Sequence, residues 1–600
     1  MSASRLWLAL VFLLFGLPLF VGLDRADLRG DEAAYSFGVD RILEIGQWLE
    51  PKISPEENLA FLEKPPLGFW IVAAPIRFGL LPNNEFGLRF WSALFGGVAF
   101  LYVFGIGRRL AGNVCGAVAV LVLFVHGPLL FDHGLRTNTP EAPLFLCYCG
   151  GMYHYFAWLS AERPSRRALH TAAVGLYFVL GFMTKDVAAV FLPLVLGLAT
   201  LAVRAYRAKF VREWTFWATA SLLVVALCVP WFVYAYLRFG RDVWNTMLGT
   251  HVYQRFTGYL DPNHLHPWNY YFVSISRNVV ASQSAIVVFG GLALLTVHTV
   301  RRRWADGGVI LLWFWVPLCL MSLGTSKLYH YTYPFLPPLA LAGGYFVSFL
   351  MARARPYMAR ARQLSDTYLT GRLPGIPAFF ARPIVRAVLL AITACALVVS
   401  LLIVLNPDPL EMKVGGTVLL RSSGLLRPLL TLFVAGTLSG LFRRVDLVVA
   451  SLLVAAFLPL AAYRAVLLRL NTGESPLRTA SDCVRRVAAR PENADIRARG
   501  MYLAGPKDSF GHEYAYYFHR MRPLRRAETP QPAILDAYLH ETLARRPVAI
   551  AVKTFEDLNG GSAAGPVIFP LVDFHDGVIL LLPDPYGVCR ADAAARTGYR

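Results

Sequence analysis

The 600-residue chain is poor in charge, and especially poor in acidic residues. Asp and Glu total 38 against 58 Lys and Arg, and charged residues make up only 16% of the chain. Hydrophobic residues make up 56%, above the roughly 45–50% that soluble globular domains reach even when Gly is counted. Many apolar runs approach about twenty residues, the length at which a helix crosses a bilayer. The composition therefore excludes an ordinary soluble protein and predicts an α-helical polytopic membrane protein.

Sequence features that are typical of several other classes are also missing. The eight cysteines show no zinc or redox spacing, and the chain has no internal repeat and no low-complexity tract. Secondary transporters commonly contain inverted repeats, so their absence argues against that class. No small-residue cleavage site follows the first apolar run, Leu6–Leu23, so we expect a retained helix and not a removed signal peptide.

Apolar runs of membrane-spanning length predict about thirteen transmembrane helices within residues 1–470. The polar part after them, residues 471–600, is long enough to fold by itself, and its pattern predicts a small α/β domain. Its expected helices are Ser481–Ala489 and Ile534–Ala544, and its expected strands are Met501–Ala504, Pro547–Val552 and Gly577–Leu582. The expected spans are Leu6–Leu23, Phe90–Gly107, Cys115–Phe131, Ala142–Leu159, Thr171–Thr184, Val187–Val203, Phe216–Leu237, Val280–Thr299, Val309–Leu323, Tyr333–Leu350, Ala387–Leu405, Leu425–Leu441 and Leu447–Ala462.

The net charge of +20 is concentrated in short arginine clusters between the apolar runs. When the spans are counted off, clusters such as Arg108-Arg109, Arg301–Arg303 and Arg443-Arg444 fall on one side, which is the pattern of cytoplasmic loops. A charge distributed in this way argues against nucleic acid as a partner. An odd number of spans places residues 471–600 outside, where Cys483 and Cys589 can either pair or remain free thiols.

The first predicted outer loop, residues 24–84, carries charges next to apolar segments. The acidic pair Asp31-Glu32 precedes a short amphipathic helix, Ala33–Gln47. The pair Glu63-Lys64 is followed by two prolines and the apolar segment Leu67–Leu80. We expect both segments to lie flat on the outer membrane surface. Charges beside a membrane span are commonly functional, so these four side chains are candidate site residues.

Five short motifs follow one another along the outer loops. They are Asp31 with Glu63-Lys64-Pro65-Pro66, Phe131-Asp132-His133 leading to Glu141, Gly181–Asp186, His251 through Tyr271, and Ser326 through Pro338. Together these motifs resemble the GT-C superfamily of glycosyltransferases. The closest resemblance is to the branch that includes lipid A aminoarabinose transferases and protein O-mannosyltransferases, and it covers roughly residues 6–344. Asp186 stands where the family usually has Gly.

The resemblance implies transfer of a sugar, with inversion, from a polyprenyl-phosphate carrier to an envelope acceptor. The acceptor would be a lipid A-like lipid, a glycan or a protein, at the outer face of a bacterial inner membrane. No nucleotide or organic cofactor is implied. The leaving lipid phosphate needs cations to meet its developing charge, and an acceptor hydroxyl needs a carboxylate base. A phosphate acceptor would need no base, and Asp31 would then orient the nucleophile.

The predicted site residues take four roles. The candidate catalytic residues are Asp31, Glu32 and Asp132. The candidate donor phosphate ligands are Lys64, Arg255, Lys327 and Tyr331, and the candidate pocket residues are Arg136 and Glu141. In the aminoarabinose branch the position that matches Glu63 helps to hold a divalent metal (Zn, Mg or Mn) with a histidine; the nearest match is His251, and His264 and His266 compete with it.

Each of these residues also has an ordinary structural interpretation. Asp31-Glu32 can simply stabilise the start of the following helix. Lys64 can serve as an interfacial anchor, and Asp132 and Glu141 can pair with Arg136. Two rival classes also remain: a secondary transporter or lipid flippase, and a structural membrane subunit. A transporter would place its charges at mid-membrane and a structural subunit would not bring them together, whereas the enzyme hypothesis requires them to converge on the outer face.

Overall fold

The structure is a computed structural model that describes most of the chain up to residue 489 and several short segments after it. The expected helix Ile534–Ala544 and most of the expected span Leu447–Ala462 lie outside the described residues. The described residues are 3–53, 60–371, 379–380, 382–405, 410–414, 417–422, 426–438, 459–473, 475–489, 491, 501–504, 512, 516–517, 524–527, 548–551, 571–574 and 578–581.

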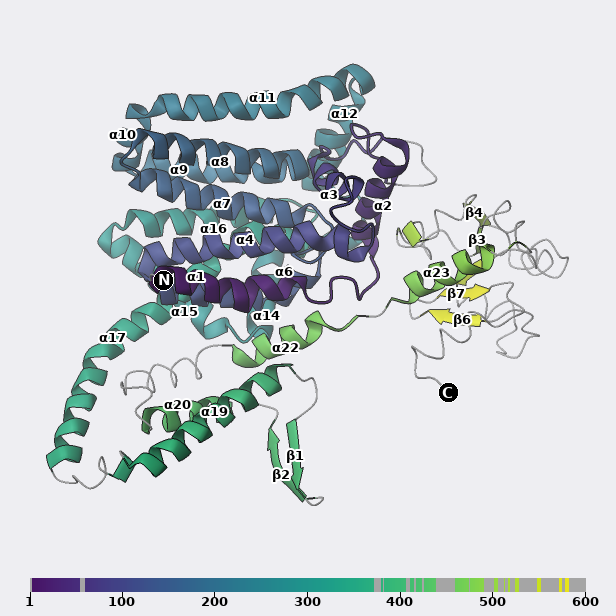
Figure 1. The fold of residues 1–600 in the computed structure, drawn as a ribbon. Helices are drawn as coiled ribbons and strands as arrows, with labels where there is room; N and C mark the ends of the chain where they lie inside the picture. Colours follow the sequence, from purple (N-terminus) through teal and green to yellow (C-terminus); the bar gives the residue numbers. More distant parts are fainter. Residues whose placement is uncertain are drawn as a thin grey trace. The chain divides into compact units, whose positions relative to one another are not determined.

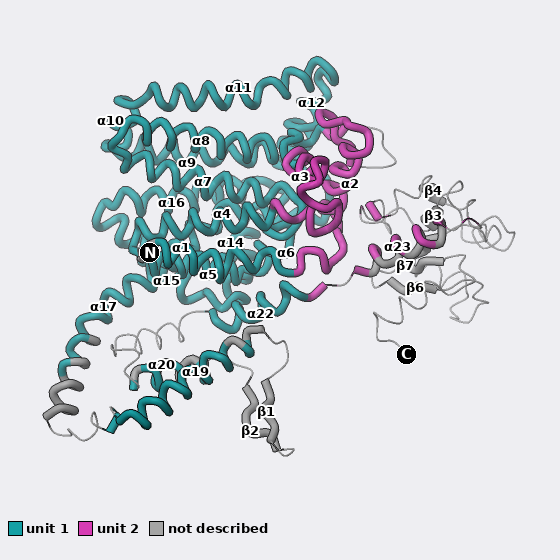
Figure 2. Tube along the Cα trace, viewed as in Figure 1, with its two compact units in different colours: residues 1–21, 62–68, 92–471 teal, residues 22–61, 69–91, 472–600 magenta. Residues whose placement is uncertain are grey.

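The chain divides into two compact units, and each is assembled from separate stretches of sequence (Figure 2). Most of the first loop groups with the C-terminal part, whereas the stretch that carries Glu63-Lys64 groups with the long helices. Unit 1 comprises residues 1–21, 62–68 and 92–471, and unit 2 comprises residues 22–61, 69–91 and 472–600.

Several long helices of unit 1 lie side by side, as α7, α8 and α11 show most clearly (Figure 1). Some pairs pack backbone to backbone: a Cβ added at Gly344 would lie 2.1 Å from the carbonyl oxygen of Cys115. Small residues at such contacts are typical of membrane helices. The helices are α4 (Glu85–Ala111, from Ser92 onward in this unit), α5 (Asn113–Phe124), α7 (Glu141–Ser160), α8 (Pro164–Lys185), α9 (Phe191–Ala202), α11 (Trp214–Phe239), α14 (Tyr270–Ala281), α15 (Ala285–Arg302), α16 (Ala305–Leu323), α17 (Leu336–Gly371), α19 (Pro383–Leu405), α20 (Leu426–Leu438) and α22 (Leu460–Leu470).

Seven helices among the described residues are long and apolar enough to cross a membrane. The number is eight if α9 and α10 (Arg204–Arg212), which are bent by 107°, count as one span. A helical, multi-span membrane protein is therefore confirmed, and the count of about thirteen stays a prediction. The predicted span Cys115–Phe131 is a broken helix, divided between α5 and α6 (Gly127–Phe131). The first run forms α1 (Ala3–Val11), which continues through a π-helical turn and a 3₁₀ turn to Phe20.

Unit 2 contains the two short helices expected in the first loop, α2 (Gly30–Ile45) and, from Phe69 onward, α3 (Leu67–Arg77). α2 ends at Gly46, whose φ of +72° is the left-handed conformation that commonly ends a helix. The rings of Tyr35, Phe61 and Phe69 pack with centroids 5.5–6.0 Å apart, which ties α2 to α3.

The C-terminal part of unit 2 has one long helix and a five-stranded sheet among its described residues. The sheet order is β4-β3-β5-β7-β6; β3 pairs in parallel with β4 and β5, and the other pairs are antiparallel. The elements are α23 (Pro476–Ala489), β3 (Met501–Ala504), β4 (Leu524–Ala527), β5 (Val548–Ala551), β6 (Leu571–Phe574) and β7 (Val578–Leu581). The sequence pattern predicted α23, β3, β5 and β7 but neither β4 nor β6. It also did not predict the unit 1 hairpin of β1 (Leu410–Val414) and β2 (Thr417–Ser422).

Candidate functional site

Two segments that are far apart in the sequence meet in unit 1. Glu63 Oε1 lies 3.4 Å from Nε2 of His251, which belongs to the π-helical segment Asn245–Gln254. Burial, together with the positive charges of Arg255 and Lys64, lowers the pKa of His251 to about 4. The imidazole is therefore neutral at neutral pH. Because both cations act on one imidazole, the structure brings together the predicted pairs Glu63-Lys64 and His251/Arg255.

Arg255 is also bound to the segment Ser326–Tyr331, which belongs to the predicted site. Its Nη1 donates a hydrogen bond to the hydroxyl of Tyr331 over 2.6 Å, and its carbonyl oxygen accepts from the Ser326 amide over 3.1 Å. The ammonium of Lys185 lies 5.2 Å from the centre of the Tyr331 ring, a cation–π distance. Two predicted phosphate ligands, Arg255 and Tyr331, thus lie in direct contact.

Lys327 has a different environment from Lys64 and Arg255. It is almost completely buried, and its Nζ donates to the carbonyl oxygens of His266, over 2.9 Å, and Gly324. Burial lowers its pKa. These contacts fasten two loops to each other, so the geometry favours a loop-fixing role for Lys327 over phosphate binding.

A cluster of carboxylates, imidazoles and a lysine lies on neighbouring segments of unit 1. The imidazoles of His133 and His330 stack with centroids 4.6 Å apart. His133 Nδ1 lies 3.0 Å from Asp132 Oδ1, and this hydrogen bond is the main reason that the pKa of Asp132 is lowered. His330 Nε2 lies 3.5 Å from Glu141 Oε1, and Lys185 pairs with that same oxygen. We call these five residues the histidine–carboxylate cluster.

Asp186, in the Lys185-Asp186 turn, has a backbone conformation that favours glycine. Asp186 has φ +38°, a left-handed conformation that glycine adopts without strain, and the family usually has Gly at this position. The Asp186 carboxylate accepts a hydrogen bond from the Val187 amide, which offsets part of the cost. The side chain of Lys185 is bound to Glu141 of α7, so Lys185 joins two helices, α7 and α8.

Arg136, predicted as a pocket residue, lies against the end of α22. Its Nη2 donates to the carbonyl oxygen of Leu470 over 3.1 Å, and its guanidinium lies 5.6 Å from the Phe131 ring centre. Arg469 lies on the same ring at 4.3 Å. These contacts give Arg136 a packing function beside its predicted pocket role.

The residues that could hold a metal are Glu63 and His251. A carboxylate and a neutral imidazole are suitable donors for zinc and other divalent ions. The competing histidines have other neighbours: His264 lies 3.7 Å from Asp261, and His266 stacks on Tyr270 at 4.0 Å. Within the described part of the chain, no group of three or more His, Cys, Asp or Glu could hold a metal ion. The donor types fit, with two protein ligands.

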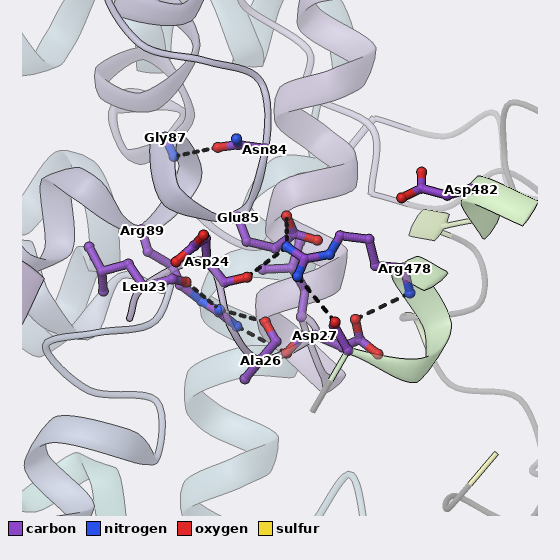
Figure 3. Close-up of polar contacts among 12 residues, drawn as sticks. Leu23, Asp24, Ala26, Asp27, Asn84, Glu85, Gly87, Arg89, Arg478 and Asp482 are labelled. Carbon is purple, nitrogen blue, oxygen red and sulfur yellow. Dashed lines mark hydrogen bonds and ion pairs between the residues drawn. The ribbon is translucent and has the colours of Figure 1, made fainter. Parts of the chain in front are cut away.

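In unit 2, one buried arginine organises the turn that precedes Asp31 (Figure 3). All five N–H groups of the Arg89 guanidinium are used. Nε and one Nη2 hydrogen bind the two oxygens of Glu32 over 2.7 and 2.8 Å. The others donate to the carbonyl oxygens of Leu23, Ala26 and Asp27 over 2.7–3.0 Å. We call this arrangement the Arg89 clasp.

The Arg89 clasp gives the two predicted acids of this loop, Asp31 and Glu32, different environments. Glu32 is buried, and both of its oxygens accept from Arg89. Asp31 lies in the same first turn of α2 with an exposed side chain. The geometry therefore favours Asp31 for chemistry and Glu32 for holding the turn.

Part of the chain matches a known protein family, and its fold matches a solved structure. Residues 63–234 match the family model described as dolichyl-phosphate-mannose-protein mannosyltransferase. The fold is that of ArnT from Cupriavidus metallidurans, whose structure bound to undecaprenyl phosphate superimposes with a TM-score of 0.61 at 17% identity, covering 97% of this chain and 98% of that one. The predicted resemblance to the GT-C superfamily of glycosyltransferases is thereby confirmed.

The chain is also similar in sequence to several curated transferases. One is the undecaprenyl phosphate-alpha-4-amino-4-deoxy-L-arabinose arabinosyl transferase 1 of Sodalis glossinidius, 29% identical over 56% of this chain. Another is the corresponding transferase of Pseudomonas aeruginosa (strain UCBPP-PA14), 27% identical over 58% of this chain. The matches span 58% and 60% of those relatives' own length, which is less than two thirds.

Three residues of these clusters were not predicted from the sequence as site residues. His133 and His330 lie inside motifs that were quoted for the resemblance, but neither was singled out, because their stacking depends on two segments meeting. Arg89 directly precedes a predicted span. A charge beside an apolar run was the only available signal, and it was noted for other residues and not for this one.

Proposed function

We propose that this protein is an inverting glycosyltransferase that moves a sugar from a polyprenyl-phosphate carrier to an envelope acceptor. The observation that carries the proposal is the convergence of Lys64 and Arg255 beside His251, with Tyr331 bonded to Arg255. Two cations and a hydroxyl, fixed by the fold and partly shielded from water, are suited to a lipid phosphate leaving group. The similarity to undecaprenyl phosphate-aminoarabinose transferases supports an aminoarabinose-like donor. The proposed acceptor is a lipid A-like lipid, a glycan or a protein.

We propose the following residue roles, which the environments of the side chains support. Lys64 and Arg255 bind the donor phosphate, with Tyr331 in support. Asp31 accepts the proton of an acceptor hydroxyl or, if the acceptor is a phosphate, orients it. Asp132 and Glu141, which belong to the histidine–carboxylate cluster, shape the pocket. The proposal also includes about thirteen spans, an outward-facing site in a bacterial inner membrane, and residues 471–600 as an extracytoplasmic α/β domain.

The proposal includes a divalent metal ion whose protein ligands are Glu63 and His251. When bound, such an ion would supply positive charge beside the donor phosphate. We expect Zn²⁺ to bind to the full-length protein after dialysis against a chelator, and binding to be lost in His251→Ala, because this removes one of two donors. Isothermal titration with Zn²⁺ in detergent measures this without an activity assay. His264→Ala is the matched control, and equal binding by both variants would contradict the assignment.

The proposal predicts dependence on a polyprenyl-phosphate donor and on Lys64. Purified full-length protein should transfer a labelled sugar from undecaprenyl phosphate to lipid A and should not use the corresponding nucleotide sugar. Lys64→Ala should lower the rate roughly 10²–10³-fold, the usual cost of removing a group that stabilises developing charge. Lys52→Ala, in the same predicted loop, is the control and should stay near the wild-type rate.

Two outcomes would overturn the proposal. One is efficient use of the nucleotide sugar; the other is equal activity of Lys64→Ala and the control. If the acceptor is a glycan or protein, transfer should appear when those acceptors replace lipid A, with the same Lys64 dependence. A flippase would instead move the labelled donor between leaflets of a vesicle without transferring the sugar.

A further inference from the structure

The start of α23 is bound to the turn that precedes Asp31, although the two are separated by most of the chain. The first N–H groups of a helix have no partner within it. Here Asp27 supplies the partners: Oδ2 accepts from the Leu477 amide over 2.7 Å, and Oδ1 accepts from the Arg478 amide over 3.2 Å. Figure 3 shows Asp27 beside Arg478. A carboxylate at a helix N-terminus also interacts favourably with the helix dipole.

A second group of contacts reinforces this attachment. Arg478 Nη1 donates to Glu85 Oε2 over 3.0 Å and to the Asp24 carbonyl oxygen over 2.6 Å. The Tyr517 hydroxyl donates to Glu85 Oε1 over 2.9 Å and accepts from the Leu28 amide over 3.0 Å. We call the contacts of Asp27, Glu85, Arg478 and Tyr517 the α23 junction.

The α23 junction and the Arg89 clasp act on the same backbone. The Asp27 carbonyl oxygen is bound by Arg89, and the Asp27 side chain is bound by α23. Asp27, Glu85 and Tyr517 are all buried. Burial also raises the pKa of Asp27 to about 6. The turn that precedes Asp31 is therefore held on one side by the start of α4 and on the other by α23.

We propose that Asp27 and Arg478 are positioning residues for Asp31. In this proposal the attachment of α23 to the turn that precedes Asp31 holds the exposed Asp31 carboxylate in one geometry. The kinetic consequence rests on the proposed glycosyltransferase function. The structural consequence, that the loop and α23 open together, does not.

Arg478→Ala tests both consequences in the full-length protein. Removing a hydrogen-bonded charge should raise amide hydrogen exchange about tenfold or more in both residues 476–489 and residues 23–32. Transfer from an undecaprenyl-phosphate sugar should lose up to about 100-fold in kcat, since a misplacement of about 1 Å can cost that much. The KM for the donor should change less than about twofold, because Lys64 and Arg255 are untouched.

The matched control is Asp482→Asn on the same helix. Asp482 is exposed and pairs with Arg485 within α23, so neither exchange nor kcat should change. Asp27→Asn gives a second variant, in which one of the two amide hydrogen bonds is lost, and it should shift both quantities in the same direction by less. Faster exchange confined to residues 476–489, or an unchanged kcat with faster exchange in both segments, would overturn the proposal. Absence of transfer by the wild type would instead overturn the glycosyltransferase function, and the exchange data would still decide whether the two segments are coupled.

Discussion

Asp31→Asn is expected to abolish most sugar transfer while leaving the protein folded. The amide has nearly the same size as the carboxylate but cannot accept the proton of an acceptor hydroxyl, and loss of a positioned base typically costs about 10²–10⁴-fold. The Asp31 side chain is exposed at the start of α2, so stability should fall by no more than about 1 kcal/mol, the usual worth of an acid at a helix N-terminus. Initial rates with saturating donor, together with a melting curve in detergent, measure both effects.

The control and the contrary outcome separate catalysis from helix capping. Asp242→Asn changes another exposed acid in the first turn of a helix, α12 (Asp242–Trp244), and should keep the wild-type rate. If Asp31→Asn behaved like this control, Asp31 would only stabilise the helix, and the base assignment would be falsified. Loss of activity with hydroxyl acceptors but not with phosphate acceptors would identify Asp31 as a base and not as an orienting group.

Arg89→Ala is expected to destabilise unit 2 by about 3–5 kcal/mol, the usual cost of removing one partner of a buried ion pair. The substitution leaves the Glu32 carboxylate buried without its bidentate partner. It also leaves the carbonyl oxygens of Leu23, Ala26 and Asp27 without that donor. The variant should accumulate poorly or unfold at a much lower denaturant concentration, which chemical denaturation of the purified protein measures.

Two comparisons show whether the buried pair is the cause. Arg109→Ala breaks a more exposed pair, with Asp306, and should cost less than about 1 kcal/mol. Arg89→Met combined with Glu32→Leu removes both charges and should recover part of the lost stability, because apolar replacement of a buried pair is often neutral. A cost for Arg89→Ala no larger than for Arg109→Ala would mean that the Arg89 clasp does not hold the loop.

Much of the fold followed from local pattern. The apolar runs located most of the long helices, since a lipid-embedded helix must be apolar over about twenty residues whatever its neighbours are. The two short loop helices were also located, and α2 begins and ends within three residues of its expected bounds. Broken helices were not predicted: hydropathy does not distinguish a continuous span from α5 and α6, which are separated at Val125 and His126.

The candidate site was predictable only in part. Motif order selected Glu63, Lys64, His251, Arg255 and Tyr331, and the structure brings these together in unit 1. It gives Lys327 two carbonyl partners, and Glu32 a bidentate arginine. A motif records residue type and spacing, but it does not record which buried carbonyl or carboxylate will stand opposite a cation.

The sequence by itself determined the class of protein, the positions of most helices and the residue types of the site, because hydrophobic length and charge distribution are properties of local segments. The tertiary structure alone decided which groups pair by hydrogen bonds and ion pairs. Glu141 meets Lys185 and His330, Arg89 fills all of its hydrogen bonds on one turn, and Asp27 binds the start of a helix 450 positions later in the sequence. Buried polar groups must find partners wherever the folded chain supplies them, and only the three-dimensional arrangement fixes which groups those are.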